Sequence, residues 1–241
     1  MTATNTTKVL LIQVRDDEPT RKQELECYHH FAGGGVDFRV HNLIAEPVTV
    51  GQLDGIESLI VGGSGDHSVV RGFPNMDSLP AVLEEARRRG LPILGNCFGA
   101  QIMAHVFGGS VVDDYENEEI GTYEIEKTAA AADDPLFGPL PERFLAMEGH
   151  HNRADRLPPD AVLLARSELC EAQAFRLGDE PHYAIQFHPE LDQERFLWRL
   201  DYYRASYAAK AEEFDRIAAG LKDTPEATSL LKRWLDVIVR K

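Results

Sequence analysis

Short apolar runs alternate with polar, helix-forming segments through the first hundred residues. Continuous apolar runs of this kind are typical of parallel strands that are covered on both faces. The predicted strands are residues 9–14, 36–42, 56–61 and 91–94. The predicted helices are residues 18–31, 77–89 and 98–107. Repeated strand–helix units predict a mostly parallel sheet with helices on both faces and right-handed crossovers.

The pattern changes after residue 110, where strand candidates follow one another without intervening helices. They are residues 122–127, 143–148, 161–166 and 172–176. Such close spacing predicts a small antiparallel β excursion. A further apolar run at residues 183–187 predicts one more strand, and apolar positions at helical spacing beyond residue 196 predict a C-terminal helical tail.

The length of 241 residues suits one α/β domain with an appendage. We expect a flexible N-terminus at residues 1–7, one main domain at residues 8–200 and a helical extension at residues 201–241.

Charge and cysteine content narrow the function classes. With 40 acidic and 25 basic residues the net charge is −15, which repels phosphate backbones and argues against nucleic acid as a partner. The three cysteines are too few and too widely spaced for a disulfide scaffold or a zinc ribbon, and they favour a reducing compartment. The polar N-terminus and the absence of a long apolar run predict a cytoplasmic protein without membrane contact.

The segment with the clearest chemistry is residues 95–101, GNCFGAQ, between a predicted strand and a predicted helix. A cysteine on such a turn projects from the carboxyl edge of the sheet, where open α/β sheets bind ligands. The helix N-terminus favours the thiolate form of Cys97, and Gly95 and Gly99 permit the tight turn of a nucleophile elbow. A free cysteine is more often a small core residue, and it is the two glycines that favour the nucleophile.

A histidine and a carboxylate follow a second apolar strand, in His188-Pro189-Glu190. A cysteine nucleophile needs a general base whose ring is oriented by a third group. His188 can take the thiol proton, and Glu190 can hold the other ring nitrogen. Alone, His188 could be an ordinary core or loop histidine and Glu190 a solvated acid in the first turn of a helix. The prediction of catalytic roles therefore depends on their occurrence together with Cys97.

A glycine-rich loop, residues 62–65, follows the third predicted strand. Its backbone N–H groups can face an oxyanion. It lacks the spacing and the lysine of a phosphate-binding P-loop, and an ordinary turn is the alternative interpretation.

These segments together resemble the class I, triad-type glutamine amidotransferases. The resemblance rests on residues 90–101 (GLPILGNCFGAQ), the glycines at 62 and 63, and residues 186–190 (QFHPE). It implies a flavodoxin-like fold and hydrolysis of the glutamine side-chain amide through a γ-glutamyl thioester. The chain is similar in particular to the amidotransferase domain of GMP synthetase, here free-standing.

The resemblance also implies roles for individual residues. Cys97 is the expected nucleophile, His188 the base and acid, and Glu190 the orienting carboxylate. The backbone N–H groups of Gly63 and Phe98 are the expected oxyanion hole. The expected substrate contacts are Gln101, His150 and His151. We expect no cofactor and no metal.

Two departures from the family pattern leave alternatives to glutamine hydrolysis open. Position 100 is alanine where many relatives carry a bulkier residue, and residues 64–67 (SGDH) replace a commoner Gly-Pro pattern. A γ-glutamyl peptide or γ-glutamyl amine hydrolase would use the same triad on a larger amide. A non-catalytic binding or regulatory subunit of a synthetase is the alternative from another class, and an ammonia-accepting synthetase subunit is the expected protein partner.

Overall fold

The computed structural model describes residues 6–207 and 211–240. The expected flexible N-terminus therefore lies almost entirely outside the described residues. The strands are β1 (Thr7–Val14), β2 (Val36–Asn42), β3 (Ser58–Ser64), β4 (Ile93–Asn96), β5 (Ser110–Asp113), β6 (Glu119–Lys127), β7 (Arg143–His150), β8 (Asn152–Arg156), β9 (Ala161–Arg166), β10 (Ala174–Leu177) and β11 (His182–Ile185). The helices are α1 (Glu18–Ala32), α2 (Leu79–Arg88), α3 (Phe98–Val106), α4 (Gln193–Tyr202), α5 (Arg204–Tyr207), α6 (Ala211–Gly220) and α7 (Pro225–Trp234), the last continued by a wider helical turn, Leu235–Val239.

Nine of the strands form one sheet, in the order β2-β1-β3-β4-β11-β10-β9-β6-β7. The first five pair in parallel, and the remaining four extend the same sheet with antiparallel pairing. The mostly parallel α/β fold with an antiparallel excursion is thereby confirmed. Because β4 and β11 are neighbours in this order, the segments that follow them come together at one edge of the sheet.

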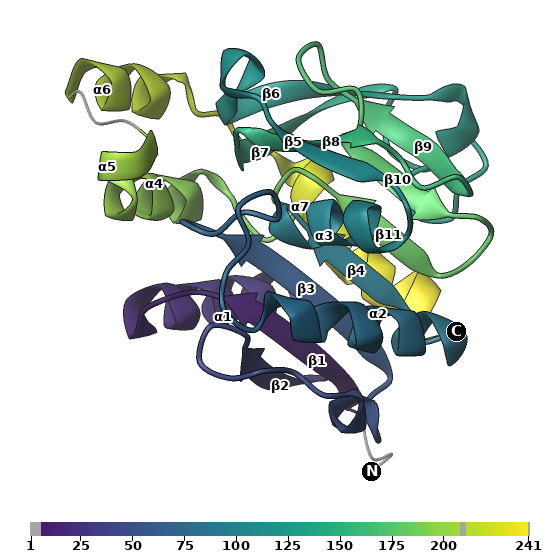
Figure 1. Cartoon of the computed structure of the whole chain (residues 1–241). Helices are drawn as coiled ribbons and strands as arrows, with labels where there is room; N and C mark the ends of the chain where they lie inside the picture. The colour runs from purple at the N-terminus through teal and green to yellow at the C-terminus, as the bar shows by residue number, and fades with distance from the viewer. Residues whose placement is uncertain (1–5, 208–210, 241) are drawn as a thin grey trace.

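Apolar side chains fill both faces of the parallel half. One core packs α2 and α3 against β1, β3 and β4, and its residues from β1 are Leu10, Ile12 and Val14. The other packs α1 and α7 against the opposite face, which carries Val9 and Leu11. The alternation along β1 follows from the two-residue period of a strand. Figure 1 shows α2 and α3 on one side of the strands and α7, in yellow, on the other.

Two short strands were missed by the sequence patterns. β5 and β8 form a separate antiparallel pair beside α3. The sequence of β8 is NRADR, and its charged residues conceal the apolar alternation by which strands are recognised. Among the described residues no helix has the length and apolar character needed to cross a bilayer.

The helical tail contributes directly to the core through α7. Trp234 is fully buried there beside Leu230, Leu231 and Ile238, whereas Trp198 on α4 is 40% exposed. The start of the tail is divided between two helices, since α4 ends at Tyr202 and α5 begins at Arg204.

Replacing Trp234 by alanine should lower the free energy of unfolding by about 3–5 kcal/mol, because it leaves a large cavity under the sheet. The matched control, Trp198→Ala, should cost less than about 1 kcal/mol, since its side chain is partly solvated. Urea denaturation followed by circular dichroism measures both. Equal costs for the two substitutions would contradict the placement of α7 in the core.

Candidate active site

Cys97 occupies a strained turn between β4 and α3. Its backbone has φ of 52° and ψ of −103°, an unusual conformation for a residue with a side chain. A hydrogen bond from its N–H to the carbonyl of Ile185 (2.8 Å) helps hold it there. A Cβ at Gly95 would lie 2.5 Å from the carbonyl oxygen of Gly99, and one at Gly99 would lie 2.1 Å from that of Val61. Both glycines are thus required by close backbone contacts around the turn.

His188 lies against Cys97 from the end of β11. The two side chains are neighbours whose charges interact, and the backbone N–H of His188 donates to the carbonyl of Met147 on β7 (2.9 Å). Gly63, at the end of β3, is beside both residues. A Cβ there would lie 3.3 Å from His188 Cε1 and 3.6 Å from Cys97 Cβ. The ends of three strands therefore meet around the cysteine.

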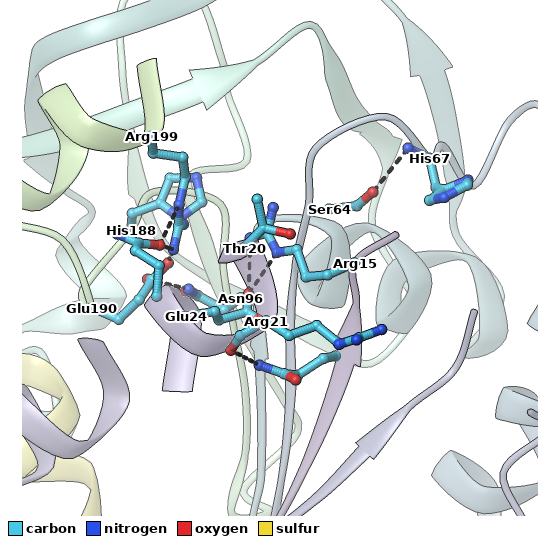
Figure 2. Close-up of polar contacts among 12 residues, drawn as sticks. Arg15, Thr20, Arg21, Glu24, Ser64, His67, Asn96, His188, Glu190 and Arg199 are labelled. Atoms are coloured by element: carbon cyan, nitrogen blue, oxygen red, sulfur yellow. Dashed lines mark hydrogen bonds and ion pairs between the residues drawn. The ribbon is translucent and has the colours of Figure 1, made fainter. Parts of the chain in front are cut away.

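Glu190 is fully buried, and both of its oxygens accept hydrogen bonds. Oε1 faces His188 Nδ1 at 2.8 Å and accepts from Arg199 Nη1 at 2.9 Å, while Oε2 accepts from the side-chain amide of Asn96. Figure 2 shows these three side chains converging on the carboxylate. Burial alone would raise the pKa of Glu190, but the charge and hydrogen bond of His188, with the charge of Arg199, hold that pKa well below its ordinary value.

The electrostatics favour a thiolate–imidazolium pair. Burial opposes ionisation of Cys97, yet the charge and hydrogen bond of His188, with a smaller contribution from His150, bring the pKa of the thiol below its ordinary value. Burial also opposes protonation of His188, but the charges of Glu190 and Cys97 raise the pKa of the imidazole. The cysteine is therefore placed to act as a nucleophile near neutral pH.

Phe98 is the first residue of α3, so its N–H belongs to the group that has no partner inside the helix. Gly63 and Phe98 flank Cys97 from β3 and from α3 respectively. The loop after Gly63 packs against the end of α4, since a Cβ at Gly65 would fall 2.2 Å from the ring of Tyr203.

A hollow opens beside Cys97 and is bordered by all three expected substrate contacts, Gln101, His150 and His151. The side-chain amide of Gln101 is buried and donates to the carbonyl of Asn152 at 2.7 Å. A larger hollow of about 580 Å³ beside β6 and β9 has neither a cysteine nor a histidine among the described residues that line it. The candidate active site is therefore identified by the reactive side chains around the hollow and not by the volume of the hollow.

His150 and His151 have different environments. His150 ends β7 and is buried, with Nε2 3.1 Å from Glu119 and 3.3 Å from Glu148. His151 is half-buried, and its ring stacks on Tyr115 with centroids 4.4 Å apart. His150 is thus engaged in an internal ion cluster, and His151 borders the open side of the hollow.

Comparison with known proteins decides the family. The family model for class I glutamine amidotransferases matches residues 29–196. The chain belongs to this family. It is 36% identical over 151 residues to a glutamine-hydrolyzing GMP synthase subunit of Thermoplasma volcanium, covering 60% of this chain and 68% of that protein.

Two further comparisons agree. The corresponding subunit of Thermoplasma acidophilum is 32% identical over 166 residues, covering 67% of this amidotransferase and 76% of that relative. A glutamine amidotransferase of Thermotoga maritima, 23% identical, superimposes with a TM-score of 0.74 over 98% of this chain and 99% of that one, and it supports the fold. The protein is a glutamine amidotransferase enzyme with the flavodoxin-like α/β fold of the family.

Several residues of the amidotransferase site were missed by the sequence patterns. Asn96 and Arg199 hold Glu190, and Arg15, fully buried, pairs with Glu24 of α1 at 2.8 Å beneath the glycine loop. An arginine directly after a buried strand, as Arg15 follows Val14, was the available signal. Arg199 carried no comparable signal, since no local pattern distinguishes it from Arg195 on the same helix α4.

Among the described residues, one cluster has the donor types of a metal site. Ligand atoms of Glu119, His150 and Cys170 lie within 4.8 Å of one another. However, Glu119 already accepts from Gln173 at 2.6 Å and pairs with His150, and burial raises the pKa of the Cys170 thiol far above its ordinary value. The Glu119 and His150 atoms are thus engaged with each other inside the amidotransferase, and Cys170 lies beside them as a buried thiol.

The pH dependence of stability should reveal this cluster. Burial raises the pKa of Glu148 to about 7, and the paired carboxylates of Glu119 and Glu148 raise that of His150 despite burial. Both raised values mean that the folded enzyme binds protons that the unfolded chain releases. The contribution of Glu148 to stability therefore falls as pH rises from about 4.5 to about 7, and that of His150 falls only above about 6.5. We expect Glu148→Gln to gain stability relative to the parent between pH 5 and pH 8, on the order of 1–2 kcal/mol.

The measurement is urea denaturation of both proteins at several pH values, with the exposed Glu124→Gln as the matched control on the neighbouring strand β6. A constant difference between Glu148→Gln and the parent across this range would contradict the buried cluster.

Proposed function

We propose that Cys97, His188 and Glu190 form the catalytic triad and release ammonia from glutamine. The observation that carries this proposal is the placement of the strained Cys97 beside His188, whose Nδ1 faces the buried Glu190 at 2.8 Å. A nucleophile, a base and an orienting carboxylate in this order are the requirement for acyl transfer through a thiol.

The proposed reaction begins with attack of the Cys97 thiolate on the side-chain amide carbon of glutamine. The N–H groups of Gly63 and Phe98 stabilise the oxyanion of the tetrahedral intermediate. His188 donates its proton to the departing nitrogen, ammonia leaves, and a γ-glutamyl thioester remains on Cys97. His188 then accepts a proton from a water molecule that attacks the thioester, which gives glutamate and restores the thiol.

Gln101 and His151 are the residues that we propose to recognise the substrate's α-amino and α-carboxylate groups. Gln101 Nε2 donates within the protein, so its oxygen is the atom that we assign to the α-ammonium group. His151 borders the hollow and is half-buried. His150 lines the same hollow, and we propose that it acts there mainly through its charge.

The acceptor of the ammonia is proposed from the relatives. The two Thermoplasma relatives described above are named as subunits of glutamine-hydrolyzing GMP synthase. We propose that this chain likewise works with a separate synthetase subunit that consumes the ammonia. Purification of the tagged protein from its source, followed by mass spectrometry, tests this, and recovery without any synthetase would contradict it.

Replacing Cys97 by alanine should lower glutamate release from glutamine by at least about 10³-fold, because the attacking atom is lost. The matched control is Cys27→Ala, since Cys27 is also buried but lies on α1 with a thiol pKa raised by burial to about 12. Glutamate formation and a γ-glutamyl adduct on the intact protein, detected by mass spectrometry, are the measurements.

The same assay distinguishes the substrate classes. We expect glutamine to be hydrolysed in preference to γ-glutamyl dipeptides and γ-glutamyl amines. Hydrolysis of the larger amides without hydrolysis of glutamine would show that the protein is a γ-glutamyl hydrolase and not a glutaminase. Full activity of Cys97→Ala would contradict both the glutaminase and the γ-glutamyl hydrolase, because each depends on this nucleophile.

A further inference from the structure

Arg199 connects the buried carboxylate of Glu190 to helix α1. Its Nη1 donates to Glu190 Oε1 at 2.9 Å, and its Nε and Nη2 donate to the side-chain oxygen of Gln23 at 3.2 and 2.7 Å. The residue is only 7% exposed. Its planar guanidinium is therefore fixed from two sides, and its anchor Gln23 is 176 residues away in the chain.

We propose that Arg199, anchored by Gln23, is a positioning residue for catalysis, which fixes the Glu190 carboxylate and through it the ring of His188 against Cys97. This inference rests on the triad proposed above. Arg199 donates to Glu190 and has no assigned contact with the substrate, so its effect on the reaction is transmitted through the carboxylate.

The geometry of the donors supports this role. Oε1 of Glu190 is shared by His188 and Arg199, and Oε2 is occupied by Asn96. A carboxylate with donors on both oxygens cannot rotate without breaking at least one hydrogen bond. Loss of Arg199 would leave Oε1 held only by His188, the group whose orientation it must determine.

The charge of Arg199 supports it as well. A fully buried carboxylate requires a nearby cation, because transfer from water to the interior is costly for an unpaired charge. His188 supplies that cation only while it is protonated, and in the proposed reaction it gives its proton to the departing nitrogen. Arg199 keeps its charge throughout, so Glu190 stays paired when His188 becomes neutral.

Other titratable groups lie around Arg199 and Glu190, and the variants of Arg199 and Gln23 below leave all of them in place. They are Arg15 after β1, Glu24, Cys27 and Tyr28 on α1, Glu148 and His150 on β7, and Arg195 and Tyr203 on and directly after α4.

The test compares Arg199→Met with Arg195→Met, which removes an arginine one turn earlier on α4 that pairs with Asp192. With glutamine as substrate, Arg199→Met should lower kcat on the order of 10²-fold and leave KM within about twofold, because orientation and not binding is lost. Both limbs of the pH profile of kcat/KM should move to higher pH, because loss of a nearby cation raises the pKa of the Cys97 thiol and that of the His188 imidazolium.

Two further variants separate charge from anchoring. Arg199→Lys keeps the charge without the planar fork and should recover part of kcat and most of the pH profile. Gln23→Leu keeps Arg199 but removes its anchor, and it should lower kcat by about tenfold with unchanged pH limbs. Arg195→Met should match the parent in each measurement.

The outcomes distinguish this inference from the triad itself. If Cys97→Ala is inactive while Arg199→Met keeps the parent's kcat and pH limbs, the triad stands and the positioning role is overturned. If Arg199→Met does not fold, Gln23→Leu decides: a lowered kcat at parental thermal stability supports the role, and an unchanged kcat overturns it. Activity in Cys97→Ala would overturn the triad.

Discussion

The buried charge of Glu190 is the constraint around which this amidotransferase is arranged. A charged carboxylate at zero exposure is costly unless hydrogen-bond donors and a cation lie beside it. His188, Asn96 and Arg199 supply these, and they come from the turn after β11, from β4 and from α4. The order of the parallel strands, which places β4 beside β11, is what brings the first two together.

Helix α1 has a larger part in the site than its position in the sequence indicates. It anchors Arg199 through Gln23, and it pairs Glu24 with Arg15 below the glycine loop. It also packs against α7, so the helical tail and the catalytic edge are connected through one element. The surplus length beyond the catalytic motifs is therefore partly structural, because α7 completes the core on which α1 rests.

The parts of the fold and site that could be predicted from sequence are those encoded locally. The elbow at Cys97 was recognisable because two glycines and a strand-to-helix change are adjacent in sequence, and β1 because its apolar run is continuous. β8 was missed because a short strand of this kind carries charged residues. Arg199 was missed because its importance depends on how α4 is rotated toward α1, which no local pattern encodes.

The contact between Gly65 and Tyr203 has a consequence for how the sequence can drift. Any side chain at position 65 would overlap the tyrosine ring where it now lies, so a replacement there requires either a shift of that ring or a smaller residue at position 203. The two positions, far apart in the chain, should therefore change together among close relatives. Paired changes at positions 65 and 203 would therefore indicate this contact in relatives for which only the sequence is known.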